Sequence, residues 1–432
     1  MGSGMPNARP PSGWEQTNLA GLADYVNGFA FNESYWSAEG LPIVRIAQIT
    51  GSQGIVDRYQ GPLPDTYRLD DGDLIFSWSG TLAVVRWHAG PAWLNQHLFK
   101  VVPRQGVDRD LLFHLLQASV AEMNKRTHGS TMKHIKRGEL REFSVSLPVD
   151  AAEQQALAEV LNTLDTTIRQ TEAIIEKLKL VKQGLLHDLL TRGIDANGEL
   201  RPPQSQAPHL YKDSPLGWIP REWEAVRMAE AIRELGQGWS PDCPPEPAAA
   251  DRWGVLKTTA IVWDGYADHE NKALPATLQP RPGLEVAPED ILITRAGPKE
   301  RVAVVAYVAH TRPRLMISDK MYRLRLREAD VPAYFALALS SQYAQAAVKR
   351  TISGMADSQT NISQPIIRMI QVMRPPTDEQ RAISLRAVAL ADQLQAEQGQ
   401  LTALGSLKIG LMDDLLTGRV RVTPLLDAAA HA

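Results

Sequence analysis

One long segment of this chain occurs twice, at residues 153–189 and again at residues 379–415. In each copy apolar residues recur at alternating spacings of four and three, the heptad pattern of helices that pair along a seam. The first copy places on this seam Leu157, Leu161, Leu164, Ile168, Ile175, Leu178, Leu185 and Leu189. The second copy places there, 226 residues further along, Ile383, Ala387, Leu390, Leu394, Leu401, Leu404, Leu411 and Leu415. The sequence therefore predicts two long helices with matching apolar stripes.

The seam is interrupted at the same two positions in both copies. Thr171 and Lys182 break it in the first copy, and Glu397 and Lys408 break it in the second. Because a period of about 3.5 residues keeps an apolar stripe aligned with a partner helix, we expect the two helices to pair with each other. The alternative is two unrelated surface helices, each packed on its own domain. The matched interruptions argue against that alternative.

Length and composition indicate a protein of two or three domains. The chain has 432 residues, 44% hydrophobic and 22% charged, which is enough apolar content for substantial cores. It lacks the roughly 18 consecutive apolar residues of a membrane helix. It also lacks a signal peptide, so we expect a cytoplasmic protein with no membrane partner. The single cysteine, Cys243, excludes an internal disulfide, and the histidines lack metal-ligand spacing, so no metal site is expected.

The distribution of charge is more informative than its total. The net charge of -3 argues against a nucleic-acid partner. However, residues 295–327 contain nine Lys or Arg against two acids, and residues 125–141 contain six against one. The two basic tracts lie in corresponding regions of the two halves and are suited to phosphate contacts, although a solvated charged face is the alternative for either one.

The segments before the two long helices also repeat. Trp14–Glu15 corresponds to Trp223–Glu224 ahead of an apolar segment, and each half continues with short apolar strands separated by turns. Each half then has a helix, a glycine-containing polar loop and a short strand that runs into proline. Arg45 and Lys257 align within strand-like runs. Trp78 and Arg295 occupy one position in the two copies, which is natural for a position that selects what it touches.

These aligned positions supply the candidate contacts to a nucleic acid. Basic residues suit phosphates, and the amide and hydroxyl side chains suit base edges, while glycine in the loops permits close approach. The candidates in the first half are Arg45, Trp78, Asn95, Gln96, Ser130, Thr131, Lys133 and His134. The candidates in the second half are Lys257, Thr258, Arg295, Lys299, Arg301, Lys320, Ser358, Gln359 and Asn361. Taken one at a time, each also has a structural explanation such as loop hydrogen bonding.

The order of these motifs, present twice, resembles the specificity subunit of type I restriction-modification systems over residues 14–422. The motifs are Gly-Trp-Ile-Pro-x-x-Trp at 217–223, the acidic turn and aliphatic strand before Gly80 and Gly297, Gly-Ser-Thr-x-x-x-Ile at 129–135, and the helix that opens with Pro-x-x-x-x-Glu-Gln at 148–154 and ends with Leu-Leu-Thr. The first helix departs in its flanks: Val149-Asp150 stands where the second copy has Pro375-Pro376, and its end reads Leu-Thr-Arg-Gly instead of Leu-Thr-Gly.

The resemblance implies an α+β fold with two tandem target-recognition domains separated by two long antiparallel coiled-coil helices, related as a pseudo-twofold internal repeat. The expected organisation is residues 1–10, an N-terminal tail beginning with a cloning scar; 11–146 and 216–372, the recognition domains; 147–193 and 373–422, the helices; 194–215, a linker; and 423–432, a C-terminal tail.

The resemblance also implies partners: double-stranded DNA, two methyltransferase subunits and, through the complex, restriction-translocase subunits. S-adenosylmethionine, ATP and Mg²⁺ are expected on those partners, with no cofactor in this chain. Each seam spans 32 residues, or about 48 Å of helix. This is longer than one turn of duplex, ~34–36 Å, and is suited to hold two half-site readers at a fixed spacing.

No catalytic residue is predicted. The sequence lacks the cofactor-binding glycine motif and Asn-Pro-Pro-aromatic motif of amino-methyltransferases and the phosphate loop of nucleotide triphosphatases. One alternative is a self-contained endonuclease that uses Asp264, Glu270 and Lys272, a short pattern with no counterpart in the first half. Another alternative is a coiled-coil scaffold with no DNA role.

Overall fold

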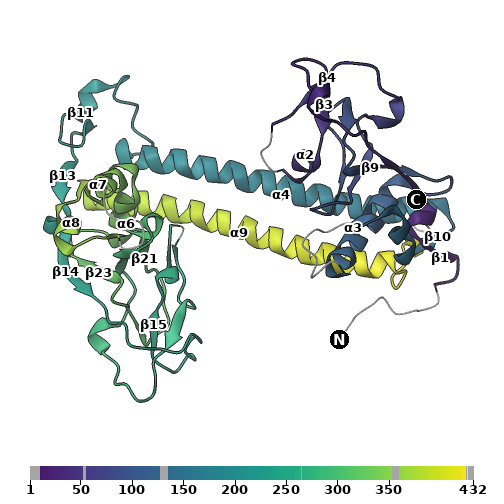
Figure 1. Ribbon diagram of the computed structural model, residues 1–432. Coiled ribbons are helices and arrows are strands. Elements are labelled where there is room, and N and C mark those ends of the chain that lie inside the picture. The colour runs from purple at the N-terminus through teal and green to yellow at the C-terminus, as the bar shows by residue number, and fades with distance from the viewer. Residues whose placement is uncertain are drawn as a thin grey trace. The chain divides into compact units, whose positions relative to one another are not determined.

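The computed structural model describes residues 10–51, 55–126, 135–263, 265–352, 360–424 and 426. The chain divides into two compact units (Figure 1). Unit 1 consists of Met1–Ala173 and Gln398–Ala432, and unit 2 consists of Ile174–Glu397. The long helices α4 (Ala151–Thr191) and α9 (Thr377–Leu416) each contribute one part to both units. Within the described residues, no helix is apolar enough over sufficient length to cross a membrane.

Unit 1 is built on an antiparallel four-stranded sheet in the order β2-β9-β6-β7 (Ala23–Asn27, Leu98–Pro103, Leu74–Ser77, Ala83–Arg86). All four residues of β6 are buried, because the sheet is covered on both faces. Leu74 and Phe76 pack in one core with residues of helix α3 (Arg109–Arg126), whereas Ile75 points to the other face. There it packs against a second sheet, in the order β4-β3-β8-β5 (Arg58–Tyr59, Leu41–Val44, Ala92–Leu94, Arg68–Leu69).

Shorter elements complete unit 1. The opening strand β1 (Trp14–Asn18) pairs antiparallel with β10 (Ser144–Pro148), with Trp14 opposite Pro148, so the start of the domain lies beside the strand that leads into α4. The remaining helical turns are α1 (Leu19–Leu22), η1 (Glu33–Tyr35), α2 (Ile46–Thr50), η2 (Asp65–Tyr67) and η3 (Arg137–Glu142).

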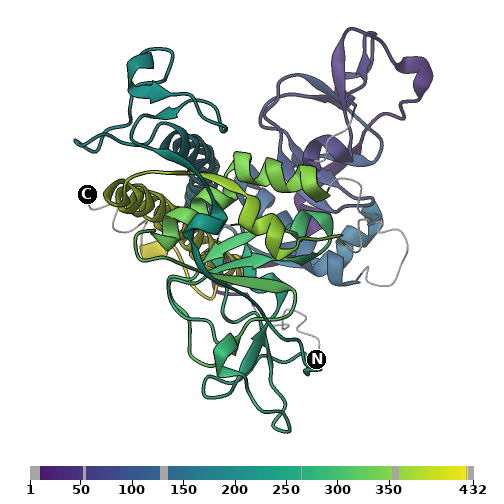
Figure 2. The same cartoon turned by 90° about the vertical axis from the view of Figure 1, so that its left-hand side faces the viewer.

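Unit 2 repeats this architecture. Its main sheet has the order β14-β23-β19-β21 (Ile232–Gln237, Met321–Leu326, Ile291–Thr294, Val305–Tyr307), and β19, like β6, is buried at every residue. A smaller sheet, β18-β15-β22 (Asn271–Ala273, Gly254–Leu256, Leu315–Met316), contains one parallel pair, as does the second sheet of unit 1. Figures 1 and 2 show this β15 region extending from the end of unit 2 away from helices α6 (Pro332–Ser340) and α7 (Gln342–Ile352).

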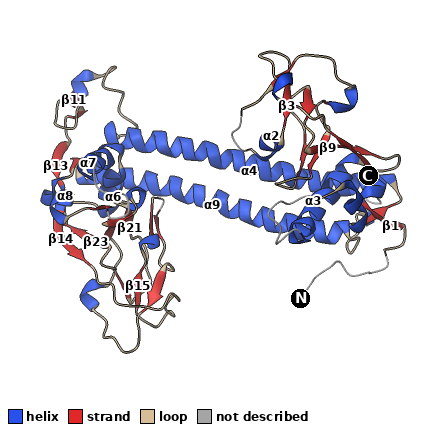
Figure 3. Cartoon of the chain, viewed as in Figure 1, coloured by secondary structure: helices blue, strands red, loops and turns tan. Residues whose placement is uncertain are grey.

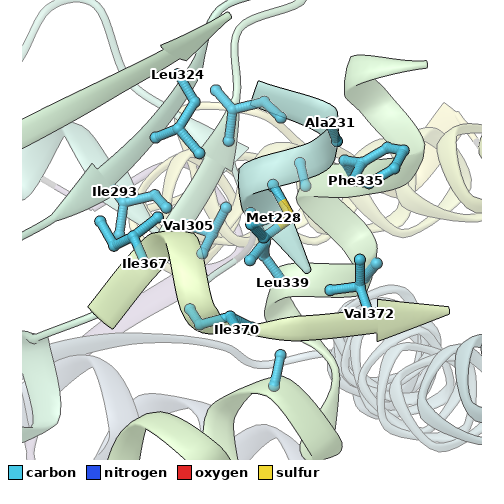
Figure 4. Close-up of a cluster of buried hydrophobic side chains, with 14 of the residues drawn as sticks. Met228, Ala231, Ile293, Val305, Leu324, Phe335, Leu339, Ile367, Ile370 and Val372 are labelled. Carbon is cyan, nitrogen blue, oxygen red and sulfur yellow. The ribbon is translucent and has the colours of Figure 1, made fainter. Parts of the chain in front are cut away.

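The core of unit 2 lies between the main sheet and its helices. Figure 4 shows side chains from the sheet meeting those of α6 and of the short helices α5 (Met228–Ala231) and α8 (Gln364–Met369), among them Ile293, Leu324, Phe335, Leu339 and Ile367. The remaining elements are η4 (Pro208–Leu210), β11 (Tyr211–Lys212), β12 (Ile219–Pro220), β13 (Glu224–Arg227), η5 (Thr258–Ala260), β16 (Ile261–Val262), β17 (Gly265–Tyr266), η6 (Pro282–Leu284), β20 (Ala296–Gly297), η7 (Lys299–Arg301), β24 (Thr360–Asn361) and β25 (Gln371–Arg374).

The matching strand orders confirm the α+β class and the internal repeat predicted from the sequence (Figure 3). In the opening of each unit, β13 pairs with β25 as β1 pairs with β10. The segment 194–215, expected to be a linker, is a folded connection: it contains η4 and β11, and β11 pairs with β12. Local pairs such as Tyr211 with Pro220 hold this connection together with distant contacts such as Ile194 N to Glu379, and composition shows neither.

The heptad positions of α4 and α9 are buried or half-buried, whereas most residues between them are exposed. In unit 1, Asp165 of α4 pairs with Lys408 of α9 (Oδ1 to Nζ, 2.5 Å), and Glu153 pairs with Arg421. From Glu153 to Asp165 the residue numbers rise, whereas those of their partners fall from 421 to 408. The two helix segments of this unit therefore run antiparallel. The interruption at Lys408 also has a cause, because its ammonium group binds Asp165 and Gln117.

The repeated Glu-Gln pair at the start of each long helix forms a junction in its own unit. In unit 2, Glu379 is bound by Trp223 (Nε1 to Oε2, 3.0 Å) and by both terminal nitrogens of Arg201 (2.5 and 3.0 Å). In unit 1, Glu153 is bound by Trp14 (Nε1 to Oε1, 3.3 Å) and by Arg421 (2.6 and 2.7 Å). Each carboxylate is almost fully buried, so its two cationic hydrogen bonds offset the loss of water.

The glutamine of the pair fixes the loop that precedes the domain's principal helix. Gln154 accepts from Asp108 N (2.8 Å) and donates to Pro148 O (2.8 Å). Gln380 makes the same two bonds in unit 2, with Val331 N (2.9 Å) and Pro375 O (2.8 Å). The two-residue motif therefore joins strand, loop and long helix at one point in each unit.

A polar network around one buried histidine distinguishes unit 1 from unit 2. His114 of α3 is fully buried, with Nε2 2.9 Å from Asn162 Oδ1, and Asn162 donates to Asp110 (3.0 Å). Arg86 pairs with the same aspartate at 3.2 Å. The residue that replaces Asn162 in unit 2 is Val388. Burial is the main cause that lowers the pKa of His114 from its ordinary value of 6.5, because burial disfavours the imidazolium ion.

We expect unit 1 to lose stability as the pH falls below about 6.5, because the unfolded chain then binds a proton that folded His114 resists. The contribution is fully present above that pH and declines below it, with a slope of up to about 1.4 kcal/mol per pH unit. Urea unfolding between pH 5 and 8 would measure this slope. His114→Gln should flatten it, whereas His88→Gln, at an exposed histidine, should not. An unchanged slope in the His114 variant would contradict the assignment.

Candidate nucleic-acid interface

In unit 2, several predicted contact residues gather where β19 ends. Arg295 follows β19, and its backbone N donates to Lys320 O (2.8 Å). Its backbone O accepts from Ile362 N (2.9 Å), and the adjacent β20 pairs with β24, which contains Asn361. Lys320 and Asn361 are exposed and Arg295 is half-buried. Three segments far apart in sequence thus bring a guanidinium, an ammonium and an amide to one place.

The equivalent place in unit 1 is built in the same way. Trp78 follows β6, and its backbone O accepts from Ile135 N (2.9 Å), as Arg295 O accepts from Ile362 N. The Trp78 ring lies 5.7 Å from Phe99 and 5.9 Å from His97 between ring centroids. The two units therefore present different side chains, an indole and a guanidinium, from one backbone position.

Other candidates are committed to internal bonds. Arg301 donates from one terminal nitrogen to the backbone oxygens of Thr258 (2.8 Å) and Ile261 (3.1 Å). Lys257 lies 3.9 Å from Glu270, and Arg45 is ion-paired with Asp57. These interactions neutralise or occupy part of the donor capacity that the sequence assigned to DNA.

Arg45 and Lys257 were expected inside strands, and this expectation is wrong by one residue. β3 ends at Val44 and β15 ends at Leu256, so each basic residue begins the turn that follows: Arg45 is the N-cap of α2, and Lys257 is the N-cap of η5. The two positions remain equivalent, but their side chains do not alternate with the strand.

The two polar residues that follow β8, Asn95 and Gln96, lie in different environments. Asn95 is 4% exposed, and its side-chain oxygen accepts from His97 N (3.4 Å), so it supports the turn from within unit 1. Gln96 is half-buried, with its amide nitrogen 3.4 Å from His97 Nε2.

Among the remaining candidates, Lys299 is exposed on η7. Ser130, Thr131, Lys133, His134, Ser358 and Gln359 lie outside the described residues.

The basic tract 295–327 contributes less surface charge than its count predicts. Arg323 is 3% exposed and pairs with Glu234 at 2.7 Å, while Arg325 pairs with Asp290 at 2.7 Å. The hydrogen bond from Arg323 is the main cause that lowers the pKa of Glu234, and the bond to Asp290 raises the pKa of Arg325. Part of the tract therefore stabilises the sheet of unit 2.

Three exposed polar residues at these sites were not among the sequence candidates. Asn27 is the last residue of β2 and Gln237 is the last residue of β14. Arg137 is the first residue of η3. A signal was present: Asn27-Gly28 and Gln237-Gly238 repeat as an amide before a glycine. A Cβ at Gly28 would lie 2.3 Å from Leu94 O, and one at Gly238 would lie 2.0 Å from Ile317 O, so both positions require glycine.

Comparison with known proteins finds a family match in the N-terminal part of the chain. Residues 11–180 match the type I restriction modification DNA specificity domain. This part of the chain is therefore similar to a type I DNA specificity domain, and the chain is similar to type I restriction enzyme specificity subunits.

Two relatives illustrate the extent of the similarity. The EcoEI specificity subunit of Escherichia coli is 39% identical over 274 residues, which cover 60% of this chain and 44% of that protein. The putative MjaX specificity subunit of Methanocaldococcus jannaschii is 23% identical over 95% of both chains. The chain thus matches less than half the length of the Escherichia coli relative but nearly all of the archaeal one.

Solved structures share the fold. The S subunit of a type I restriction-modification system from M. genitalium superposes with a TM-score of 0.61 at 14% identity, covering 95% of this chain and 97% of that one. A chain from a structure of complex assembly in a type I R-M system gives 0.51 at 14% identity, covering 96% and 100%.

Proposed function

We propose that this chain is the DNA-specificity subunit of a type I restriction-modification complex and reads a bipartite target, one half with each unit. The observation that carries the proposal is the duplicated backbone arrangement at Trp78 and Arg295. Two units with the same backbone arrangement but different side chains at this position could recognise two different half-sites. Each base pair presents its own pattern of hydrogen-bond donors and acceptors, which requires matching side chains.

In this proposal α4 and α9 set the distance between the half-sites. Their antiparallel contacts in unit 1 and the lengths of the two helices support this role. A helix is a stiff spacer whose length is fixed by its residue count. The unread spacer in the DNA would then follow from the lengths of the helices.

We further propose that catalysis belongs to partners: two methyltransferase subunits that bind S-adenosylmethionine, and restriction-translocase subunits that use ATP and Mg²⁺. The complex would act in the cytoplasm. Docking of a partner is supported by apolar side chains exposed on the helix segments of unit 2, including Ile174 (46% exposed), Leu180 (71%), Val181 (47%) and Leu385 (71%). Side chains of this kind at a helix surface are typical of protein interfaces.

The endonuclease alternative has weaker support. Asp264 lies outside the described residues, and Glu270 is engaged by Thr259 Oγ1 (2.5 Å) and by Lys257. Within the described part of the chain, no group of three or more His, Cys, Asp or Glu residues is placed to hold a metal ion. Incubation of the purified chain with Mg²⁺ and plasmid tests this alternative, and cleavage without partners would support it.

Genome-wide mapping of methylated adenines tests the proposal directly. The chain would be co-expressed with its methyltransferase in a host lacking other adenine methylation. We expect one motif with two short specified blocks and an unspecified gap of constant length. Methylation at a single continuous motif, or methylation independent of this chain, would refute the bipartite reading and favour the scaffold alternative.

A further inference from the structure

A cluster of three side chains recurs at equivalent places in the main sheets of the two units. In unit 1, Asn27 at the end of β2 lies opposite Phe99 of β9. In unit 2, Gln237 at the end of β14 lies opposite Tyr322 of β23. Each unit therefore places an exposed amide beside a buried aromatic ring at the same register position.

A guanidinium group completes each cluster, but it comes from a different part of the chain. The Arg137 guanidinium carbon lies 5.6 Å from the centre of the Phe99 ring, and Arg137 donates to Asn27 Oδ1 (3.1 Å). The Arg295 guanidinium carbon lies 5.6 Å from the centre of the Tyr322 ring. Arg137 lies on η3, whereas Arg295 follows β19, so the repeat does not account for the coincidence.

In unit 2 the amide and the guanidinium share one acceptor. Gln237 Nε2 and an Arg295 terminal nitrogen both donate to the backbone oxygen of Asp319, at 3.2 and 3.1 Å. In unit 1 the amide accepts directly from the guanidinium. The geometry differs in detail, but in both units the two polar groups are held next to each other over a rigid strand.

The charges of these guanidinium groups are not neutralised by the described residues. Arg323 and Arg325 of the same sheet have carboxylate partners. By contrast, no ion pair to Arg137 or Arg295 is formed within the part of the chain that the structure describes. Arg137 donates instead to an amide oxygen, and Arg295 donates to a carbonyl oxygen. Arg295 Nε is buried and has no hydrogen-bond partner among those residues.

An aromatic ring next to a guanidinium group restricts the orientation of that group. An arginine that is already oriented loses less entropy when its two terminal nitrogens bind a bidentate acceptor. Guanine offers such an acceptor in the major groove through O6 and N7, and amide side chains pair similarly with adenine. A phosphate contact would require charge but not this combination of orientation and neutral neighbours.

We propose that Arg137 with Asn27, and Arg295 with Gln237, are base-reading pairs, one for each half-site, and that each guanidinium contacts a guanine. This inference rests on the proposed function and adds to it the residues that determine specificity. It also explains why unit 1 retains a guanidinium at this place although Trp78 occupies the position of Arg295.

The test uses the complex of the full chain with its methyltransferase and compares methylation motifs of variants. Arg137→Ala should reduce discrimination at one G·C pair of a single half-site by about 5- to 150-fold and leave the other half-site unchanged. Arg295→Ala should do the same at the other half-site. Arg137→Lys, which keeps the charge but removes the fork, should also lose discrimination.

The matched control is Arg104→Ala. Arg104 is an exposed arginine of unit 1 that follows the other end of β9 and pairs with Asp24 at 3.1 Å. Arg104→Ala should leave the methylation motif unchanged.

The inference is overturned if the Arg137 and Arg295 variants keep the wild-type motif, whether methylation stays normal or falls evenly at all sites. The second pattern would indicate a phosphate contact or a folding defect. If the wild-type complex shows no bipartite motif, the proposed function fails and this inference fails with it. A bipartite wild-type motif that the variants retain refutes only the assignment of these residues.

Discussion

Glu379→Ala is expected to lower the free energy of unfolding of unit 2 by about 3–5 kcal/mol, one of the largest effects of a single substitution in this chain. Glu379 and Arg201 have side chains that are 9% and 10% exposed and are joined by two hydrogen bonds. Removing the carboxylate takes away the acceptor of the Trp223 indole N–H. It also leaves the buried Arg201 guanidinium with the backbone oxygen of Arg192 and the exposed Glu222 as its remaining partners. Urea unfolding followed by tryptophan fluorescence would measure the loss.

The neighbouring residue provides the control. Asp378 is 97% exposed and pairs with Arg381 at 3.0 Å on the surface of the same helical turn. Asp378→Ala should change stability by less than about 0.5 kcal/mol, because exposed ion pairs contribute little. The double variant Arg201→Met/Glu379→Leu should recover much of the loss, since apolar residues replace both buried charges. Equal effects of the two alanine variants would contradict this explanation.

Inserting one heptad into both long helices should lengthen the unread spacer of the DNA target by about three base pairs. Seven residues add about 10.5 Å of helix, and duplex DNA rises about 3.4 Å per base pair. The insertions would follow Ala173 in α4 and Glu397 in α9, where each helix passes from one unit to the other. A full heptad keeps the seam in phase. Methylome mapping would report the new gap.

Both half-site sequences should stay unchanged in this variant, because neither unit's sheet is altered. Seven residues inserted after Thr277, in the exposed loop between β18 and η6, serve as the control and should leave the spacer at its original length. Altered half-sites with an unchanged gap would show that the helices do not set the distance.

The sequence was most informative where the pattern is local. The heptad stripe predicted two long helices because burial on one face imposes a period that can be read along the chain. In the structure both helices begin and end a few residues inside the expected ranges. The start of α4 is fixed by the preceding proline and by the cap at Asp150, whose side chain accepts from Ala152 N (3.0 Å). The repeated strands were visible for the same reason.

Interactions between distant residues were not predictable in this way. Glu379 and Arg201 are 178 positions apart, and Glu153 and Arg421 are 268 apart, so the Glu-Gln motif indicated only a helix start. At the candidate site, the alignment of Trp78 with Arg295 selected a position that the structure places at the end of β6 and β19. Arg137 was missed because its aromatic partner, Phe99, is distant in sequence and because the equivalent guanidinium of unit 2, Arg295, comes from a different position in the repeat.

The connection between Glu153 and Arg421 bears on how the protein is made. Unit 2 is one continuous stretch, whereas unit 1 combines the beginning of the chain with residues from Gln398 onward. Since domains fold as their residues leave the ribosome, unit 2 has its complete sequence before unit 1 does. Until Arg421 is synthesised, Trp14 and Glu153 lack the cation that their junction requires. A premature stop near the carboxyl end would therefore damage the half of the molecule encoded first.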